Sequence, residues 1–341
     1  MSHSKIASFW YIACQSRELK TKPKAVSILG KHMALFRDDA GKAVAIEDRC
    51  LHRNAKLSEG TVKKGCIVCP YHVWSFNGQG EVTDIPSEGG CTKVKRRQTT
   101  MPVIEQQGYI YCWLGEEPPS PEERPFEIPH YSTPGFHRVK LINRFENTVT
   151  NCVENFIDIP HTVFVHPGIF RVRRDQKIGA TIVRKGGTVE ISYSNETDNL
   201  GFFSRFFNPD RKEIVHYDRF LMPNVTSVEY FISEKRHFVI TSQSIPVGER
   251  ETLTYTDVTY NYGIWSKLAT PLVRHQAQAI ISQDQVILKN QNDNIKKFGQ
   301  AFQNSPADAI HVLVESIRRQ LEDGKDPLLL PQKTKEVEFW I

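Results

Sequence analysis

Two short groups of cysteine and histidine constrain this chain more than any other feature. The first is Cys50-Leu51-His52, and the second, after sixteen further residues, is Cys69-Pro70-Tyr71-His72. Two cysteines and two histidines at such spacings can hold a zinc ion tetrahedrally. They can equally hold a two-iron cluster, with both thiolates on one iron and both imidazoles on the other. Either site requires two loops of the chain to meet at one point.

The sequence around these groups is typical of an antiparallel β domain. Short β-type runs alternate with turns rich in Gly, Asp and Lys, which indicates a sandwich or a barrel. The runs are residues 25–29, 32–36, 43–47, 66–68, 102–105 and 109–114. A run precedes each Cys/His group, so two loops can converge. Zinc ribbons offer a similar hairpin, so the strands alone do not separate zinc from a cluster.

Composition excludes several classes of protein. The 341 residues are enough for about two domains. A formal net charge of +5 is too mild for a nucleic-acid binder. No apolar run approaches the roughly 18 residues of a membrane span, and the N-terminus does not resemble a signal peptide. The seven cysteines are an odd number, which favours thiols or metal ligands over disulfides and predicts a reducing, cytoplasmic location.

A domain boundary is predicted at residues 118–136, where six prolines lie among glutamates. We therefore expect a β domain at 1–117, a linker at 118–136 and a second domain at 137–341. Strands are predicted at residues 138–143, 180–183, 188–193, 228–232, 238–243 and 253–260, and helices at 151–164 with a break at Pro160, at 271–298 and at 305–323. The last helix has Ser305 as N-cap, Pro306 at its first position and Gly324 after its end. The whole chain is predicted to be α+β.

The residues that follow the two Cys/His groups carry a family resemblance. Arg53 follows the first, and Trp74-Ser75-Phe76-Asn77-Gly78-Gln79-Gly80 follows the second after one residue. Together these segments closely resemble the iron–sulfur signature of the Rieske-type non-haem iron oxygenases. The resemblance implies a [2Fe-2S] cluster held by Cys50, His52, Cys69 and His72. Val73 stands where the family usually has glycine, a departure that concerns the turn beside His72. Respiratory Rieske proteins fit less well, because they carry an extra cysteine in each cluster loop.

A second candidate site lies between residues 155 and 166. Asn155, Asp158 and His161 are spaced by three and share a helical face, and His166 follows five residues later. Two histidines on an otherwise apolar segment are candidates for two corners of a 2-His-1-carboxylate iron site. Taken alone they could equally be core histidines satisfied by hydrogen bonds. Their resemblance to the mononuclear iron motif of the same family favours Fe(II).

The third ligand has two candidates on the helix predicted after Pro271. Asp284 lies among Ile280, Ile281, Ile287 and Leu288 at helical spacing, where a lone buried carboxylate is costly unless something positive binds it. Asp293 lies among lysines and asparagine and is expected to be solvated. We therefore select Asp284, and the family resemblance agrees. The alternative is a carboxylate paired with a neighbouring Arg or Lys.

Further roles follow only from the resemblance. It implies that Asp158 bridges electrons to the second cluster histidine, here His72, of a neighbouring subunit in a homotrimer. Asp158 also lies three residues before His161 and can accept the proton of its ring N–H. Asn155 matches a family position near the iron. The second domain is expected to be helix-grip-like, with pocket walls for which Phe202, Phe203, Phe206, Phe207, Tyr230 and Phe231 are aromatic candidates.

The predicted function is that of a terminal oxygenase of the monooxygenase and demethylase branch. It uses O2 to hydroxylate a small organic substrate, or to remove an N- or O-alkyl group by hydroxylation. No G-x-G-x-x-G follows a strand, so electrons from NAD(P)H are expected through a separate reductase or ferredoxin. Neither nucleic acid nor a membrane is expected as a partner. An electron-transfer protein with a non-functional second iron site and a metal-free carrier of small ligands are the alternatives.

Overall fold

The computed structural model describes residues 5–90, 95–167, 177–194, 214–233 and 236–340. These residues divide into two compact units. The first is Ala7–Glu127, and the second begins at Ile128 and holds the rest of the described chain together with the residues before Ala7. The division falls within the proline- and glutamate-rich segment 118–136.

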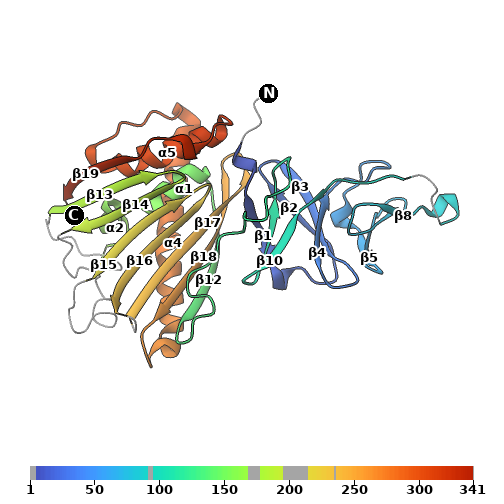
Figure 1. Ribbon diagram of the computed structural model, residues 1–341, viewed down its shortest axis with the longest axis horizontal. Helices are drawn as coiled ribbons and strands as arrows, with labels where there is room; N and C mark the ends of the chain where they lie inside the picture. Colours follow the sequence, from blue (N-terminus) through green and yellow to red (C-terminus); the bar gives the residue numbers. More distant parts are fainter. Residues whose placement is uncertain (1–4, 91–94, 168–176, 195–213, 234–235, 341) are drawn as a thin grey trace. The chain divides into compact units, whose positions relative to one another are not determined.

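The first unit is built from short antiparallel strands (Figure 1). They are β1 (Trp10–Gln15), β2 (Lys24–Ile28), β3 (Lys31–Arg37), β4 (Ala43–Glu47), β5 (Thr61–Lys63), β6 (Cys66–Val68), β7 (Ser75–Phe76), β8 (Val82–Asp84), β9 (Thr100–Met101), β10 (Val103–Gln106) and β11 (Tyr109–Trp113). Among the described residues they form sheets in the orders β1-β11-β10, β2-β3-β4-β9 and β5-β6-β7-β8. The predicted all-β character of this half of the chain is confirmed.

A hydrophobic core joins the second and third of these sheets. It contains Phe36 and Ile46 from the first, Ile67 and Phe76 from the other, and Leu57 from the connection between them. The predicted cluster cysteines belong to the same core, so their loops are fixed by the burial of the strands that precede them.

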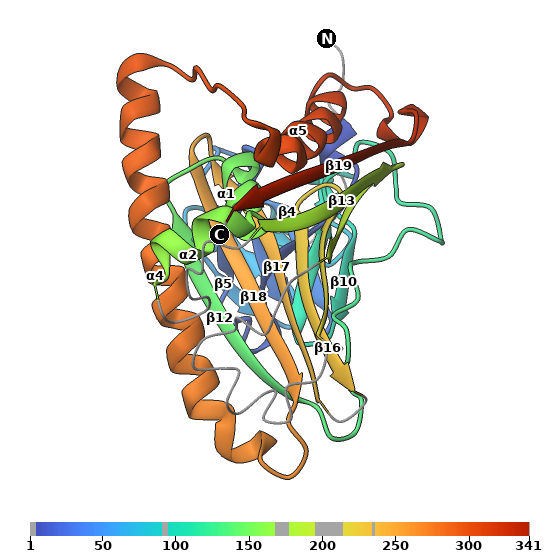
Figure 2. The same ribbon diagram turned by 90° about the vertical axis from the view of Figure 1, so that its left-hand side faces the viewer.

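The second unit is one large antiparallel sheet with helices packed on it (Figures 1 and 2). Its elements are β12 (His137–Phe145), α1 (Val149–Phe156), α2 (Ile159–Val165), β13 (Lys177–Lys185), β14 (Thr188–Ser194), β15 (Val215–Leu221), β16 (Val225–Ser233), β17 (Arg236–Gly248), β18 (Glu251–Asn261), α4 (Ser266–Phe298), α5 (Ala309–Glu322) and β19 (Lys333–Trp340). In the described chain the sheet has the order β12-β18-β17-β16-β15-β14-β13-β19.

The helix α4 covers one face of this sheet beside β12 (Figure 2). Val273 of α4 is buried against Leu141, Tyr230 and Val258 of the strands. Because residues two apart in a strand face the same side, this packing defines the inward face of each strand. The space between that face and α4 is where the candidate site of the second unit lies.

Several elements differ from their predicted form. In the first unit, β1, β5, β7, β8 and β9 were not among the predicted runs. The helix predicted from residue 271 begins at Ser266, because Ser266 joins Tyr262 and Gly263 in a hydrogen-bonded turn that starts the helix five residues earlier, with Pro271 inside it. The strands β15 and β19 were not predicted, since their sequences are too polar to show an apolar alternation. Pro160 lies in the first turn of α2, where its missing N–H costs no hydrogen bond.

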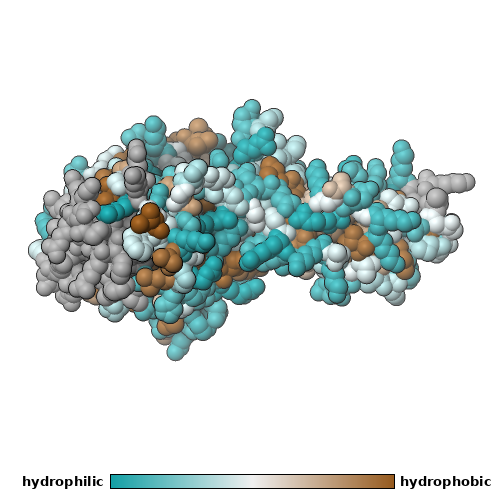
Figure 3. Space-filling model, turned by 90° about the horizontal axis from the view of Figure 1, so that it is seen from below, coloured by the Kyte–Doolittle hydropathy of each residue, from teal (hydrophilic) through white to brown (hydrophobic). Residues whose placement is uncertain are grey.

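The last helix begins as its sequence predicts. The side chain of Ser305 and that of Asp308 form a reciprocal capping box around a short 3-10 turn, with Pro306 at its start, and α5 follows directly. None of the described helices combines the length and the apolar character needed to cross a membrane. On the face seen in Figure 3, the described surface is mostly hydrophilic and its apolar side chains form separate patches.

Candidate functional site

The first site is formed by two loops of the first unit. Cys50 lies three residues beyond β4, and Cys69 directly follows β6. Hydrogen bonds close both loops: Cys50 N–H donates to the carbonyl of Ala55 (2.8 Å), and Cys69 N–H donates to that of Trp74 (2.9 Å). Both cysteine side chains are buried. The loops therefore present two thiols inside the core of the unit.

The two histidines lie beside these thiols. The ring centroids of His52 and His72 are 4.4 Å apart, and the His52 ring stacks on Trp74 at 4.8 Å. Nδ1 of His52 is buried and has no hydrogen-bond partner. The pKa of the Cys50 thiol is raised to about 11, chiefly by burial and also by the adjacent Cys69 thiol. An orphaned ring nitrogen and two buried, interacting thiols are the donors that a thiolate- and imidazole-bound metal group requires.

Val73, which replaces the usual glycine, has the backbone conformation that glycine favours. Its φ angle is +63°, in the left-handed region where a β-branched residue is strained. The turn is nonetheless closed, since the hydrogen bond between Cys69 and Trp74 spans it. The turn beside His72 therefore closes with valine at this position.

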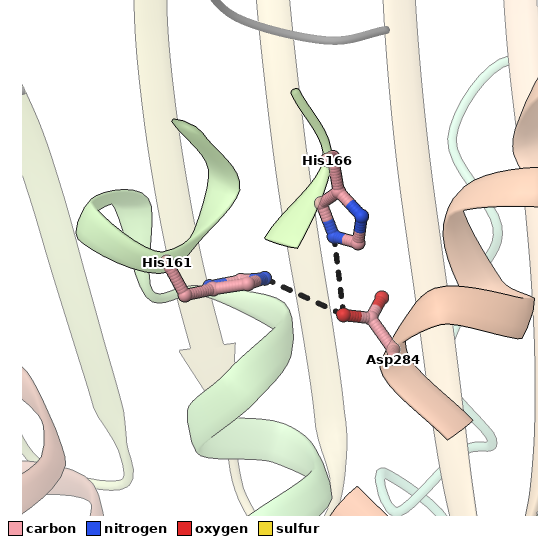
Figure 4. A group of neighbouring side chains, drawn as sticks. All are labelled: His161, His166 and Asp284. Carbon is pink, nitrogen blue, oxygen red and sulfur yellow. Dashed lines mark ion pairs between the residues drawn. The ribbon is translucent and has the colours of Figure 1, made fainter. Parts of the chain in front are cut away.

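The second site joins α2 to α4 (Figure 4). His161 lies within α2, His166 ends that helix as its C-cap, and Asp284 lies in the middle of α4. Oδ1 of Asp284 is 3.1 Å from Nε2 of His166 and 3.5 Å from Nε2 of His161. One donor atom of each residue lies within 4.8 Å of the other two, and Asp284 and His166 are buried.

A buried asparagine fixes the segment of α1 and α2 against α4. The side-chain nitrogen of Asn147, just before α1, donates to the carbonyl of Leu288 and to Oε1 of Gln291, each at 2.8 Å. Its side-chain oxygen accepts a hydrogen bond from Asn151 (2.7 Å). These bonds hold the histidine segment in register with the part of α4 that carries Asp284.

The donor atoms of the second site have the features of a metal centre. Oδ1 of Asp284 is buried and forms no well-aligned hydrogen bond, although two imidazole nitrogens face it. Burial alone would raise the pKa of Asp284, yet His161 and His166 outweigh burial and lower it. Two imidazoles and one carboxylate are the donor set of mononuclear non-haem iron sites. The residues present therefore fit a mononuclear iron ion.

Residues outside the three donors orient them. Nδ1 of His166 lies 2.8 Å from Oε1 of Gln283, which can only accept, so Nδ1 carries the proton and Nε2 keeps its lone pair. Asp158 is the N-cap of α2 but makes no capping bond with its side chain. Its Oδ2 lies instead 3.3 Å from Nδ1 of His161. Burial lowers the pKa of His161, but Asp158 and Asp284 outweigh burial and raise it to about 9.

A cavity opens beside these residues, between α1, α2, α4 and the inward face of the sheet. Its volume is about 120 Å³. Its lining includes His161, His166 and Asp284. The other lining residues are Asn155, Phe156, Ile157, Asp158, Ile159, Thr162, His216, Asp218, Thr226, Val228, Tyr230, Ile240, Ser242, Thr256, Val258, Ala277, Ile280 and Ile281.

The residues predicted from the sequence fall into two groups. Cys50, His52, Cys69 and His72 come together in the first unit, and His161, His166, Asp284 and Asp158 in the second. Asn155 and Tyr230 line the cavity, whereas Phe231 does not, and Phe202, Phe203, Phe206 and Phe207 lie outside the described residues. Asp293 is solvated and lies 3.6 Å from Lys289.

Sequence reasoning missed Gln283, His216 and Asp218. Gln283 directly precedes Asp284, and its position next to a proposed ligand was the available signal. The other two lie on β15, which was not predicted, so nothing in the sequence placed them at the cavity.

Comparison with known proteins gives the class of protein that this fold and these sites define. Residues 9–102 match the family described as "Rieske [2Fe-2S] domain". Residues 146–324, slightly more than half of the chain, match the family described as "Vanillate O-demethylase oxygenase C-terminal domain". The chain therefore belongs to the Rieske non-haem iron oxygenases, and its cofactors are the [2Fe-2S] cluster and the mononuclear iron of that family.

Two curated relatives illustrate the similarity. The chain is 34% identical to aminopyrrolnitrin oxygenase PrnD of Pseudomonas fluorescens over 171 residues, which are 48% of this chain and 47% of that protein. It is 24% identical to the oxygenase component of dicamba O-demethylase of Stenotrophomonas maltophilia over 299 residues, 83% of this chain and 87% of that protein. The chain thus spans about half the length of the first relative and most of the second.

Solved structures share the fold. Dicamba monooxygenase bound to dicamba has a TM-score of 0.78 at 22% identity, covering 93% of this chain and 97% of that chain. NdmA of Pseudomonas putida CBB5 with caffeine has a TM-score of 0.76 at 19% identity, covering 97% of both chains. The two-part α+β architecture predicted from the sequence, with a helix-grip-like second part, is confirmed.

Proposed function

We propose that this chain is the terminal oxygenase of a multi-component system, which inserts one atom of O2 into a C–H bond of a small organic substrate. The observation that carries the proposal is the convergence of His161, His166 and Asp284 on one point at the edge of a largely apolar cavity. Where the attacked carbon bears nitrogen or oxygen, hydroxylation leads to dealkylation. The relative named as the oxygenase component of dicamba O-demethylase supports this reaction class.

The proposed site residues belong to two metal centres with different roles. Cys50, His52, Cys69 and His72 hold the [2Fe-2S] cluster, which supplies electrons one at a time, and the mononuclear iron of the second unit supplies oxygen activation. Gln283 holds His166 in the tautomer that a metal ion needs. Asn155 and the apolar cavity wall position the substrate. One oxygen atom enters the product and the other leaves as water, which consumes two electrons and two protons.

The electrons come from outside the chain in this proposal. A separate reductase or ferredoxin, itself reduced by NAD(P)H, reduces the cluster. In the trimer that we propose, Asp158 then connects His161 to His72 of a neighbouring subunit. The rim of the cluster loops supports such docking, since Leu51, Tyr71 and Val73 are all large apolar side chains with 39–64% exposure.

Charge supports the same assembly. A groove beside Asp158 is lined by Asp308 and Glu315, and also by Arg319, which pairs with Glu315 at 2.6 Å. The pKa of His52 is lowered first by burial and then by His72, with smaller contributions from the positive groups Arg53 and Arg96. Positive groups beside the cluster loops and the carboxylates of Asp158 and Asp308 in the groove have opposite charges.

Three measurements test the proposal. Protein purified without air should contain about three irons and two acid-labile sulfides per chain, and its reduced form should give a Rieske electron paramagnetic resonance signal. With a reductase and NADH, O2 uptake should depend on substrate and release formaldehyde from a methoxyarene that the chain demethylates. Two irons with two sulfides, unchanged after addition of Fe(II), would instead establish an electron-transfer protein, and metal without sulfide a zinc site.

A further inference from the structure

The sheet wall of the cavity contains a polar group that the oxygenase reaction does not use. The inward residues of β15 to β18 form rows across the strands, because their register pairs Asp218 with Val228, Val228 with Ile240, and Ile240 with Val258. The next row begins with His216, which is paired with Tyr230. His216 and Asp218 are therefore adjacent and face the cavity, next to Val228 and Tyr230. We call these two residues the β15 dyad.

The dyad is rigidly held. Oδ1 of Asp218 lies 3.0 Å from Nε2 of His216, and Oδ2 accepts a hydrogen bond from the hydroxyl of Tyr193 (2.6 Å). The His216 ring is stacked between Tyr193 at 4.6 Å and Tyr230 at 4.2 Å, with 21° and 15° between the planes. His216 and Asp218 are 4% and 2% exposed. Both faces of the imidazole are covered, so a ligand can reach it only at its edge.

Burying a carboxylate is costly unless other groups compensate for the lost hydration. The carboxylate accepts two hydrogen bonds, and this lowers the cost of burial without adding any apolar contact. A wall built only for stability would be served better by apolar residues of the same size. The wall also contains Thr226, Ser242 and Thr256, and the hydroxyls of Ser242 and Thr256 form a hydrogen bond of 3.0 Å.

The charged residues that line the cavity favour uncharged ligands over anionic ones. Of the described residues that line it, none is Lys or Arg, while Asp158, Asp218 and Asp284 are acidic. An anionic group placed beside Asp218 would be repelled in a medium of low dielectric constant. A hydroxyl or N–H group has no such cost and can form a hydrogen bond with the dyad.

We propose that the β15 dyad binds a hydroxyl or N–H group of an uncharged, otherwise apolar substrate, and thereby sets which carbon faces the iron site. This inference rests on the proposed function, because it names the substrate class of that oxygenase site. Its test uses equilibrium binding in the absence of O2 and electron donors, so it does not depend on turnover.

The test compares three probes of similar size on the anaerobic, iron-loaded protein by titration calorimetry. They are 4-methoxyphenol, 4-methylanisole, which lacks the hydroxyl group, and 4-methoxybenzoate, which carries a negative charge. One hydrogen bond to such a group predicts that the phenol binds roughly tenfold or more tightly than either of the others.

Two variants assign the preference to the dyad. His216→Phe keeps an aromatic ring between Tyr193 and Tyr230 and should make the phenol and 4-methylanisole bind equally, with unchanged iron content. Asp218→Asn removes the charge with little change of shape; it should reduce the preference and improve the binding of 4-methoxybenzoate. The matched control is His237→Phe, because His237 also pairs with a carboxylate, Oε1 of Glu229 at 2.7 Å, but does not line the cavity.

The outcomes separate the two proposals. Equal affinities of the wild-type protein for the phenol and 4-methylanisole, including no detectable binding of either, would overturn the role of the dyad. A preference that survives both dyad variants, or that His237→Phe also removes, would overturn it as well. A preference that depends on the dyad in a protein that releases no formaldehyde from 4-methoxyphenol would leave the dyad in place and refute demethylation of this probe.

Discussion

Replacing Glu154 by Gln should stabilise the second unit at alkaline pH and have little effect near pH 5. Glu154 lies at the end of α1, and its pKa is raised from 4.5 to about 8, first by burial and then by the negative charge of Glu315, with smaller contributions from Asp158 and Asp308. Arg318 acts in the opposite direction and does not compensate. The folded chain therefore keeps a proton on Glu154 that the unfolded chain loses above pH 4.5.

The magnitude follows from this difference in proton binding. Between pH 4.5 and 8 the folded state binds more protons than the unfolded state, so stability falls as the pH rises through this interval. At about 1.4 kcal/mol for each pH unit, the interval from 4.5 to about 8 amounts to at most about 5 kcal/mol. Glutamine resembles the protonated form of Glu154 in shape and hydrogen bonding, and the variant avoids this loss.

Thermal unfolding at fixed protein concentration measures the effect. For a unit of this size, about 1 kcal/mol corresponds to roughly 2–4 °C in Tm, so Glu154→Gln should raise Tm by on the order of 10 °C at pH 8.5 and by much less at pH 5. Glu315→Gln removes only the repulsion and should give a smaller change of the same sign. An equal difference at both pH values would refute the reasoning, since it would mean that Glu154 is ionised and paired, for instance with a cation of a neighbouring subunit.

Three further predictions concern the iron sites. Asp284→Ala should lower the iron content by about one per chain and spare sulfide, whereas Asp293→Ala, on the solvated face of α4, should change neither; retention of iron by the first variant would refute the assignment of Asp284. Asp158→Ala should leave both centres loaded and reduce substrate-coupled O2 uptake by at least about a hundredfold, and near-normal coupled uptake would show that electrons take another route. Cys69→Ser should lose the sulfide and the Rieske signal while the mononuclear iron remains, as measured by metal analysis and spectroscopy; an intact signal would place the cluster elsewhere.

The sequence predicted those parts of the fold that depend on local pattern. The strand β4 coincides with the predicted run at 43–47 and β6 with that at 66–68, because both are continuous apolar runs bounded by turns. Residues of β19 such as Lys335 and Glu336 gave no such signal, since most of this strand is exposed and its place at the sheet edge comes from pairing with β13. Exposed strands are specified by their partners, which a single segment does not reveal.

The metal-binding part of the candidate site was predictable, because metal binding requires particular residue types. The spacing of His161 and His166 made them candidates, and the family resemblance favoured iron ligands over core histidines. Asp284 was selected because its neighbours on the helix are apolar. The spacing of His216 and Asp218 was not enough to select them, because they reach the cavity through the register of a strand with the sequence Val-His-Tyr-Asp-Arg-Phe-Leu. Whether His216 and Asp218 line the cavity depends on which face of the sheet they occupy. Only the pairing of the strands determines that face.

The helical wall and the sheet wall of the cavity differ in how a mutation affects the site. The proposed iron ligands lie on helices, whose position depends on buried contacts such as those of Asn147, so most changes there disturb the metal. The opposite wall is made of strand residues, and a substitution such as Val228 or Ile240 to a polar residue alters the surface offered to a ligand while leaving the ladder intact. Selection for a new substrate can therefore act on the sheet one residue at a time, with the oxygen-activating chemistry inherited unchanged.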